Sequence, residues 1–112
     1  MPLLVGIPDK KIAQYLKYRN YMVASDEGEA VGIAAGYYLA TGKRATVFMS
    51  ADGFCNALNP ITSYLIPEKI QMDFIIGTGR QEPHHKVMSD SLYKIIKAIC
   101  YDARKLDFSV FK

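Results

Sequence analysis

The stretch Ala24-Ser25-Asp26-Glu27-Gly28-Glu29-Ala30 runs directly into Val31-Gly32-Ile33-Ala34-Ala35-Gly36-Tyr37-Tyr38-Leu39-Ala40 and decides the fold of this chain. It predicts a helix that begins with three acidic residues and continues with small, apolar residues unsuited to face water. Acids are favourable there because the first turn has free amide donors and a positive partial charge. Asp26 as N-cap and Glu29 three residues later form a capping box. Glu27 is not needed for the cap, and it stands between a strand and a buried helix, where α/β sheets bind ligands.

Composition narrows the class of protein. The chain has 112 residues, half of them hydrophobic, which suits one globular domain. No basic leader with an apolar core opens the sequence, and no apolar run approaches the ~18 residues of a membrane span. A cytoplasmic protein without a membrane segment is therefore expected. The net charge of +3 is modest and its basic residues are scattered, so nucleic-acid binding is not expected.

Short apolar runs alternate with helical patterns along the chain, which is typical of a parallel sheet covered by helices. Strands are expected at residues 3–6, 21–24, 45–49 and 72–77. Helices are expected from Lys10, over 27–40 with a stop at Thr41-Gly42, and from Ser89 or Asp90 onward. The segments 50–55 and 78–88 are expected to be loops, and Asn59-Pro60 is expected to be a helix start or a turn.

These elements predict a three-layer α/β fold, with a mostly parallel sheet and helices on both faces. Residues 1–103 are expected to form this single domain. Residues 104–112 are expected to be a C-terminal tail or a short edge strand.

The run from Glu27 to Lys43 resembles the pyrimidine-binding domain of thiamine-diphosphate enzymes, in particular the phosphonopyruvate and sulfopyruvate decarboxylases. Three further segments resemble the same family in the same order: Gly6–Asp9, Ser50–Ser63 and Gly79–His85. The resemblance extends from about residue 4 to about residue 97. It implies a compact or shortened pyrimidine-binding domain, because the family usually continues through a further strand and helix.

The resemblance assigns Glu27 to the glutamate that hydrogen-bonds the pyrimidine N1′ of the cofactor. That contact favours the imino tautomer, whose 4′-nitrogen generates the reactive carbanion. Gly28, without a side chain, would let a flat ring approach the backbone. The alternative is that Glu27 only complements the helix dipole.

Three segments imply contacts with the reacting end of the cofactor and with the substrate. Asp9 matches an aspartate expected to relay protons, and its plainer alternative is a helix cap. His85 takes the place of the family histidine, which can transfer protons. Arg80 and His84 are expected to bind the anionic group of a substrate, although exposed loop residues often have no such role.

Ser50, Gly53 and Asn56 match a cofactor-binding loop of the family, but Ala51-Asp52 and Cys55 depart from its pattern. Ala51-Asp52-Gly53 is similar to the Gly-Asp-Gly that opens the diphosphate and magnesium motif. That motif needs a downstream asparagine, and Asn56 follows too soon to complete a metal site. No metal site is expected in this chain, so a partner chain is expected to hold Mg²⁺ and the diphosphate.

The sequence thus predicts one half of a thiamine-diphosphate-dependent decarboxylase for a small anionic 2-oxoacid, sulfopyruvate or phosphonopyruvate. Its partner would be a diphosphate-binding subunit or domain in a homo- or hetero-oligomer. A second possibility is a reduced, non-catalytic pyrimidine domain that acts as an interaction module or is a remnant. A third, a flavodoxin-like phosphate-binding domain, is disfavoured because no glycine-rich loop follows the first strand.

Overall fold

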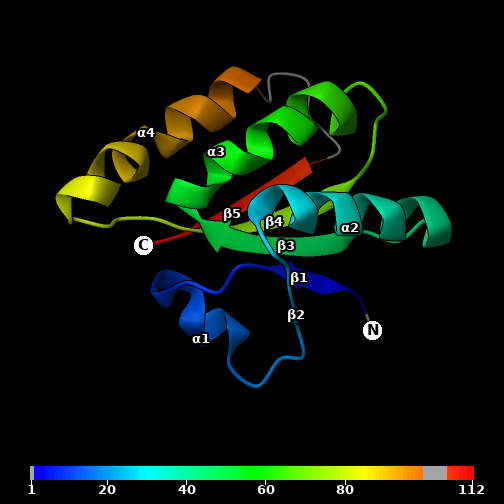
Figure 1. Cartoon of the computed structure of the whole chain (residues 1–112), viewed down its shortest axis with the longest axis horizontal. Coiled ribbons are helices and arrows are strands. Elements are labelled where there is room, and N and C mark those ends of the chain that lie inside the picture. Colours follow the sequence, from blue (N-terminus) through cyan, green and yellow to red (C-terminus); the bar gives the residue numbers. More distant parts are fainter. Residues whose placement is uncertain (1, 100–105) are drawn as a thin grey trace.

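The computed structural model describes residues 2–99 and 106–112. Their elements follow one another in a strand–helix alternation: β1 (Leu4–Gly6), η1 (Lys10–Ile12), α1 (Ala13–Leu16), β2 (Met22–Val23), α2 (Glu27–Thr41), β3 (Ala45–Ser50), α3 (Ala51–Pro60), η2 (Ile61–Leu65), β4 (Met72–Gly77), α4 (Pro83–Ile99) and β5 (Leu106–Phe111). Figure 1 shows these elements along the chain. The four strands expected from the apolar runs are all present.

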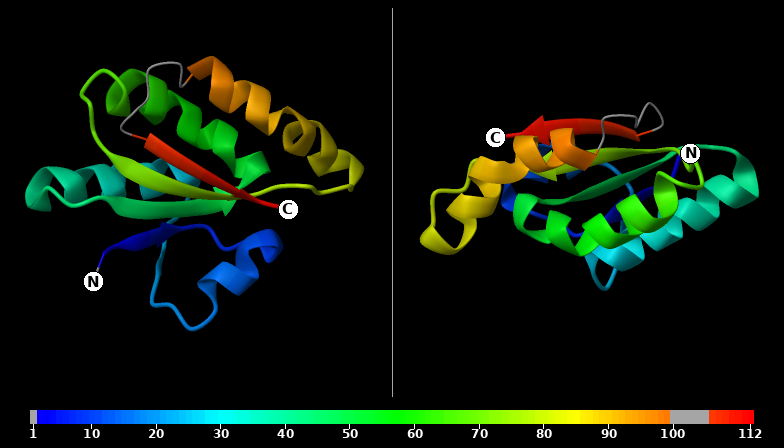
Figure 2. Two further views of the ribbon diagram at one scale, coloured as in Figure 1. Left: turned by 180° about the vertical axis from the view of Figure 1, so that it is seen from behind. Right: turned by 90° about the horizontal axis from the view of Figure 1, so that it is seen from above.

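The five strands form one sheet in the order β2-β1-β3-β4-β5, and every neighbouring pair is parallel. β3 and β4 pair along their whole length, and β5 continues the register on the other side of β4. Figure 2 shows β5 running beside β4 at the edge of the sheet. The C-terminal segment therefore supplies a six-residue edge strand.

The two faces of the sheet carry different layers of helix. Val5, Val47 and Phe74 belong to a large core that also contains the buried residues of α2, α3 and α4. Leu4 and Phe48 point the other way, into a smaller core with η1 and α1. Figure 1 accordingly shows α1 on the opposite side of β1 from α3 and α4. The predicted three-layer α/β fold is confirmed.

Helix α2 begins and ends where its sequence indicates. The Asp26 side chain accepts a hydrogen bond from the Glu29 amide at 2.7 Å, and the Glu29 carboxylate accepts from the Ser25 amide at 2.8 Å. At the other end Gly42 takes the left-handed conformation, with φ of 73°. Among the described residues, no helix is long and apolar enough to cross a membrane.

Two helix starts were predicted wrongly. The segment 50–55 is not a loop, because Ser50 caps α3 and the helix begins at once after β3. Asn59 and Pro60 are therefore the last residues of α3. Proline has no amide hydrogen to donate, and after Pro60 the chain continues as the wider, π-helical turn η2. The last helix begins at Pro83 and not at Ser89 or Asp90, since proline is well suited to the first helical position.

Candidate active site

The candidate residues gather where the parallel strands end. In Figure 1 the first turns of α3 and α4 lie toward the left of the view, as α1 does, although α1 is on the other side of β1. The chain leaves β1 toward β2 on one side and returns past β1 to β3 on the other. In doubly wound sheets, such a reversal leaves a crevice at the carboxyl ends of the strands, and ligands bind there.

The Glu27 carboxylate is held between two helix starts. Its Oε1 accepts a hydrogen bond of 2.9 Å from Asn56 Nδ2. Its Oε2 lies directly over Gly53, where a Cβ atom would come within 2.0 Å of it. Glu27 itself is half-buried. The acid at the start of α2 thus rests on the first turns of α3, and only a glycine at position 53 permits that approach.

The other predicted cofactor-binding residues lie in the same place. Ser50 Oγ accepts a hydrogen bond of 3.3 Å from the Gly53 amide and so fixes the first turn of α3. Gly28 faces the Asn56 carbonyl, which a Cβ at position 28 would approach to 3.3 Å. The structure therefore brings together all five predicted cofactor-binding residues, which come from two separate helix starts.

Asp9 and Arg80 form an ion pair beside this group. Arg80 Nη1 donates to Asp9 Oδ1 at 3.0 Å, while Asp9 Oδ2 accepts from the Lys11 amide at 3.1 Å. Only 9% of the Asp9 side chain is exposed, so its charge depends on these donors. Gly77, the last residue of β4, allows the approach, because a Cβ there would lie 2.6 Å from Asp9 Oδ2. Asp9 is both a helix cap and an ion-pair partner.

Arg80 also binds Glu82 on its exposed side. Its Nε and Nη2 donate to the Glu82 carboxylate at 3.4 and 3.3 Å. This hydrogen bond raises the pKa of Arg80, with smaller contributions from the charges of Glu82, Asp9 and Asp52. A backbone hydrogen bond and then Arg80 lower the pKa of Glu82. The guanidinium predicted to bind substrate is therefore already shared by two carboxylates of its own chain.

His85 lies against an acid that the sequence did not single out as a site residue. Its Nδ1 contacts the carboxylate of Asp52, in the first turn of α3. The neighbouring His84 is exposed. The signal that could have identified Asp52 is its place two residues after the end of an apolar strand pattern, since residues that directly follow a parallel strand lie at its carboxyl end, where ligands bind.

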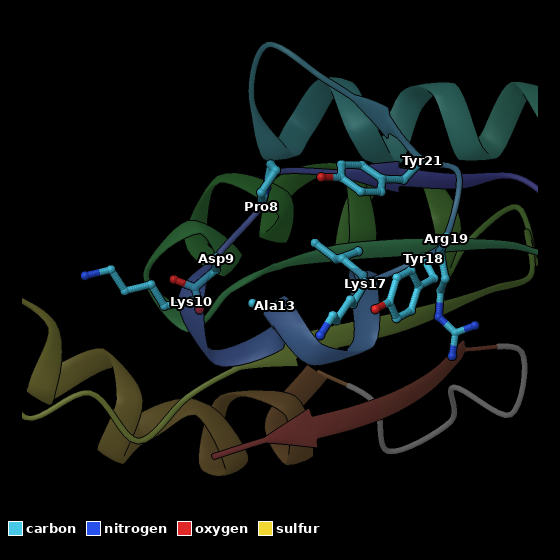
Figure 3. A pocket seen from close by; sticks show the side chains of 9 residues that line it. Pro8, Asp9, Lys10, Ala13, Lys17, Tyr18, Arg19 and Tyr21 are labelled. Atoms are coloured by element: carbon cyan, nitrogen blue, oxygen red, sulfur yellow. The ribbon is translucent and has the colours of Figure 1, made fainter.

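A cavity of about 730 Å³ adjoins Asp9 on the side of α1. Pro8, Leu16 and Tyr21 give it apolar walls, and Lys17 and Arg19 stand at its rim. Figure 3 shows Lys10 pointing away from the other lining side chains. The cavity therefore offers an apolar space beside a carboxylate whose charge is balanced by Arg80.

The family resemblance would set Glu27 and Gly28 against the pyrimidine end of thiamine diphosphate. A partly exposed carboxylate at a helix start, next to Gly28, suits a flat ring nitrogen. For the diphosphate end, residues 2–99 and 106–112 contain no group of three or more histidine, cysteine, aspartate or glutamate side chains able to hold a metal ion. Glu27 and Gly28 are therefore the described residues that would lie against a pyrimidine ring.

No family model matches the chain. A curated protein, phosphonopyruvate decarboxylase from Streptomyces hygroscopicus, is 36% identical over 67 residues. The match covers 60% of this chain but only 16% of that relative, so this chain spans a small part of the relative's length. The similarity thus relates part of this α/β domain to a small part of a decarboxylase.

Proposed function

We propose that this chain is the pyrimidine-binding half of a thiamine-diphosphate-dependent 2-oxoacid decarboxylase. A second chain or domain would hold the diphosphate and Mg²⁺, and the cofactor would lie between the two. The observation that carries the proposal is the Glu27 carboxylate, held between Asn56 and Gly53 at the start of α2. Similarity to part of phosphonopyruvate decarboxylase supports the same reaction class.

Glu27 would hold a proton at the pyrimidine N1′. Asn56 donates to Oε1, so Oε2 is the oxygen left to share a proton with a ring nitrogen. Gly28 leaves the adjoining backbone without a side chain, so that a flat ring can approach. The chemistry that thiamine diphosphate supplies when bound is a nucleophilic carbon and a sink for the electrons left when carbon dioxide departs.

Asp9 and His85 would handle protons at the reacting end. Asp9 is nearly buried and balanced by Arg80, while His85 lies beside Asp52 and keeps part of its ring exposed. A histidine can donate or accept a proton near neutral pH. One of these groups would supply the proton that replaces the departing carboxylate and yields the aldehyde.

The substrate would be a small 2-oxoacid with a second anionic group, as in phosphonopyruvate and sulfopyruvate. Arg80 is the predicted partner of that group, with His84 nearby. Since Glu82 is the more exposed of the two acids on Arg80, the anion would replace Glu82 and leave the Asp9 contact in place. The planar guanidinium suits a phosphonate or sulfonate.

The test is reconstitution. The chain is mixed with a protein from the same source that carries the Gly-Asp-Gly…Asn diphosphate motif, thiamine diphosphate and Mg²⁺. Carbon dioxide release is then measured with each acid. Release that requires both chains and the cofactor supports the proposal. No release from either acid, in a complex shown to bind the cofactor, would contradict it.

The second candidate is a non-catalytic interaction module. It is favoured by one observation, that several polar groups of the site already pair with one another. Asn56 occupies one oxygen of Glu27, and Arg80 is divided between Asp9 and Glu82. A chain that binds its partner equally well with and without the cofactor, and never supports decarboxylation, would favour this alternative.

A further inference from the structure

We propose that Asp52 is a positioning residue that fixes His85 as the Nδ1–H tautomer and leaves Nε2 as its working nitrogen. The role of His85 in catalysis rests on the proposed function, but the tautomer itself does not. Asp52 stands where the resembled family has another residue type. The contact joins the first turns of α3 and α4, which are 33 positions apart in sequence.

The two ring nitrogens of His85 have different surroundings. His85 Nδ1 is buried and has no hydrogen bond of regular geometry, and the group that it lies against is the Asp52 carboxylate. The side chain as a whole is 37% exposed, so its exposed area belongs to atoms other than Nδ1, and Nε2 is not among the buried unpaired atoms of the described residues. The two nitrogens of His85 are therefore not equivalent.

The Asp52 carboxylate determines which nitrogen of His85 carries the proton. An ionised carboxylate only accepts hydrogen bonds, so the nitrogen against it must carry the proton. A neutral imidazole has one N–H, and placing it on Nδ1 leaves the lone pair on Nε2. An acid that orients a histidine in this way also stabilises the ring when Nε2 takes up a second proton.

Several charged side chains surround the His85–Asp52 pair. The charge of Asp52 makes a small contribution to the raised pKa of Arg80, and the charge of His85 makes a small contribution to the lowered pKa of Glu82. With a neutral ring, the three carboxylates of Asp9, Asp52 and Glu82 outnumber the Arg80 guanidinium by two negative charges. The His85–Asp52 pair thus lies in a cluster with a net negative charge.

The test uses nuclear magnetic resonance of the full chain labelled with ¹⁵N-histidine. The chain has two histidines, so exposed His84 serves as the internal reference. Long-range proton–nitrogen correlations, at a pH where both rings are neutral, identify the tautomer of each. We expect His85 to be Nδ1–H and His84 to be a mixture. In Asp52→Ala, His85 should become a mixture like His84.

Two further variants make the result decisive. Asp52→Asn offers both a donor and an acceptor, so the tautomer preference should weaken while the side-chain shape is kept. Asp90→Asn removes an equal charge from an acid that pairs with Lys86, and should leave the His85 signals unchanged. An Nε2–H ring at position 85 in the unmodified chain, or an Asp52→Ala spectrum identical to it, would overturn the proposal.

The reconstituted enzyme gives the functional readout. Asp52→Ala should lower kcat on the order of 10-fold to 100-fold, with little change in KM, because the substrate contacts remain. An unchanged kcat together with the expected tautomer shift would overturn the positioning role. An unmodified complex without activity, combined with the expected tautomer, would instead count against the proposed function alone.

Discussion

The carboxylate of Glu27 lies directly over Gly53, so close that a Cβ atom at position 53 would come within 2.0 Å of Oε2. Gly53 stands in the first turn of α3, where glycine has no conformational advantage of its own. The absence of a side chain at this position is thus explained by the acid above it. The position of the acid and the residue type beneath it depend on each other.

Gly53→Ala should separate stability from function. Alanine is the better helix former, so the variant should be as stable as the unmodified chain, or up to about 1 kcal/mol more stable. The methyl group displaces the flexible end of Glu27, and reconstituted activity should fall at least tenfold, or about 1.4 kcal/mol. Urea unfolding and the decarboxylation assay measure the two effects.

Gly36→Ala is the matched control for this substitution. Gly36 is also a helix residue, and a Cβ added to it meets nothing within 4 Å. It should gain a similar stability and keep its activity. Full activity in Gly53→Ala would show that the position of Glu27 over the glycine does not matter.

Ser50→Ala should destabilise the chain by about 1 kcal/mol, because the Gly53 amide loses its capping acceptor. Ser50→Asp restores an acceptor and should recover most of this loss. Equilibrium unfolding in urea measures both changes. Equal stability of Ser50→Ala and the unmodified chain would mean that the cap does not stabilise α3.

Arg44→Lys should weaken the sheet without affecting the site. Arg44 lies at the other end of the strands, where its guanidinium binds Asp73 at 2.6 Å and the Gln71 side chain at 3.0 Å. Lysine cannot make these contacts together, so a loss of about 1 kcal/mol is expected in urea unfolding. Activity at a temperature where the variant stays folded should be unchanged, and a loss there would connect the two ends of the sheet.

The Glu82 titration should depend on Arg80. The pKa of Glu82 lies below its ordinary value of 4.5, first through a backbone hydrogen bond and then through Arg80. The pair therefore adds stability above that ordinary value, and this is lost as the pH falls through the lower, folded pKa. In Arg80→Met, carbon-detected magnetic resonance should show the pKa of Glu82 partway back toward 4.5. An identical titration curve would contradict the Arg80 contribution.

The sequence predicted the strands because each is a buried apolar run bounded by glycine, proline or polar residues. It also predicted both ends of α2, since Asp26 and Gly42 are strong local signals. The start of α3 was missed because Gly53 reads as a loop residue. Its actual role, room for the Glu27 carboxylate, depends on a residue 26 positions away.

Contacts between residues far apart in sequence also decide the geometry of the candidate site. Local sequence pattern and family resemblance pointed to Glu27, Asn56 and His85 as separate residues. The hydrogen bond between Glu27 and Asn56 and the contact between His85 and Asp52 join segments that only the strand order brings together. Partners across such distances carry no local periodicity, so sequence patterns alone do not predict them.

The most direct measurement compares Glu27→Gln with Glu29→Gln in the reconstituted enzyme. Both changes remove one negative charge from the first turn of α2, and a glutamine at position 29 can still accept from the Ser25 amide. We predict that Glu27→Gln abolishes carbon dioxide release, while Glu29→Gln keeps it and both variants stay folded. Full activity in Glu27→Gln, or an equal loss in the two variants, would contradict the role assigned to Glu27.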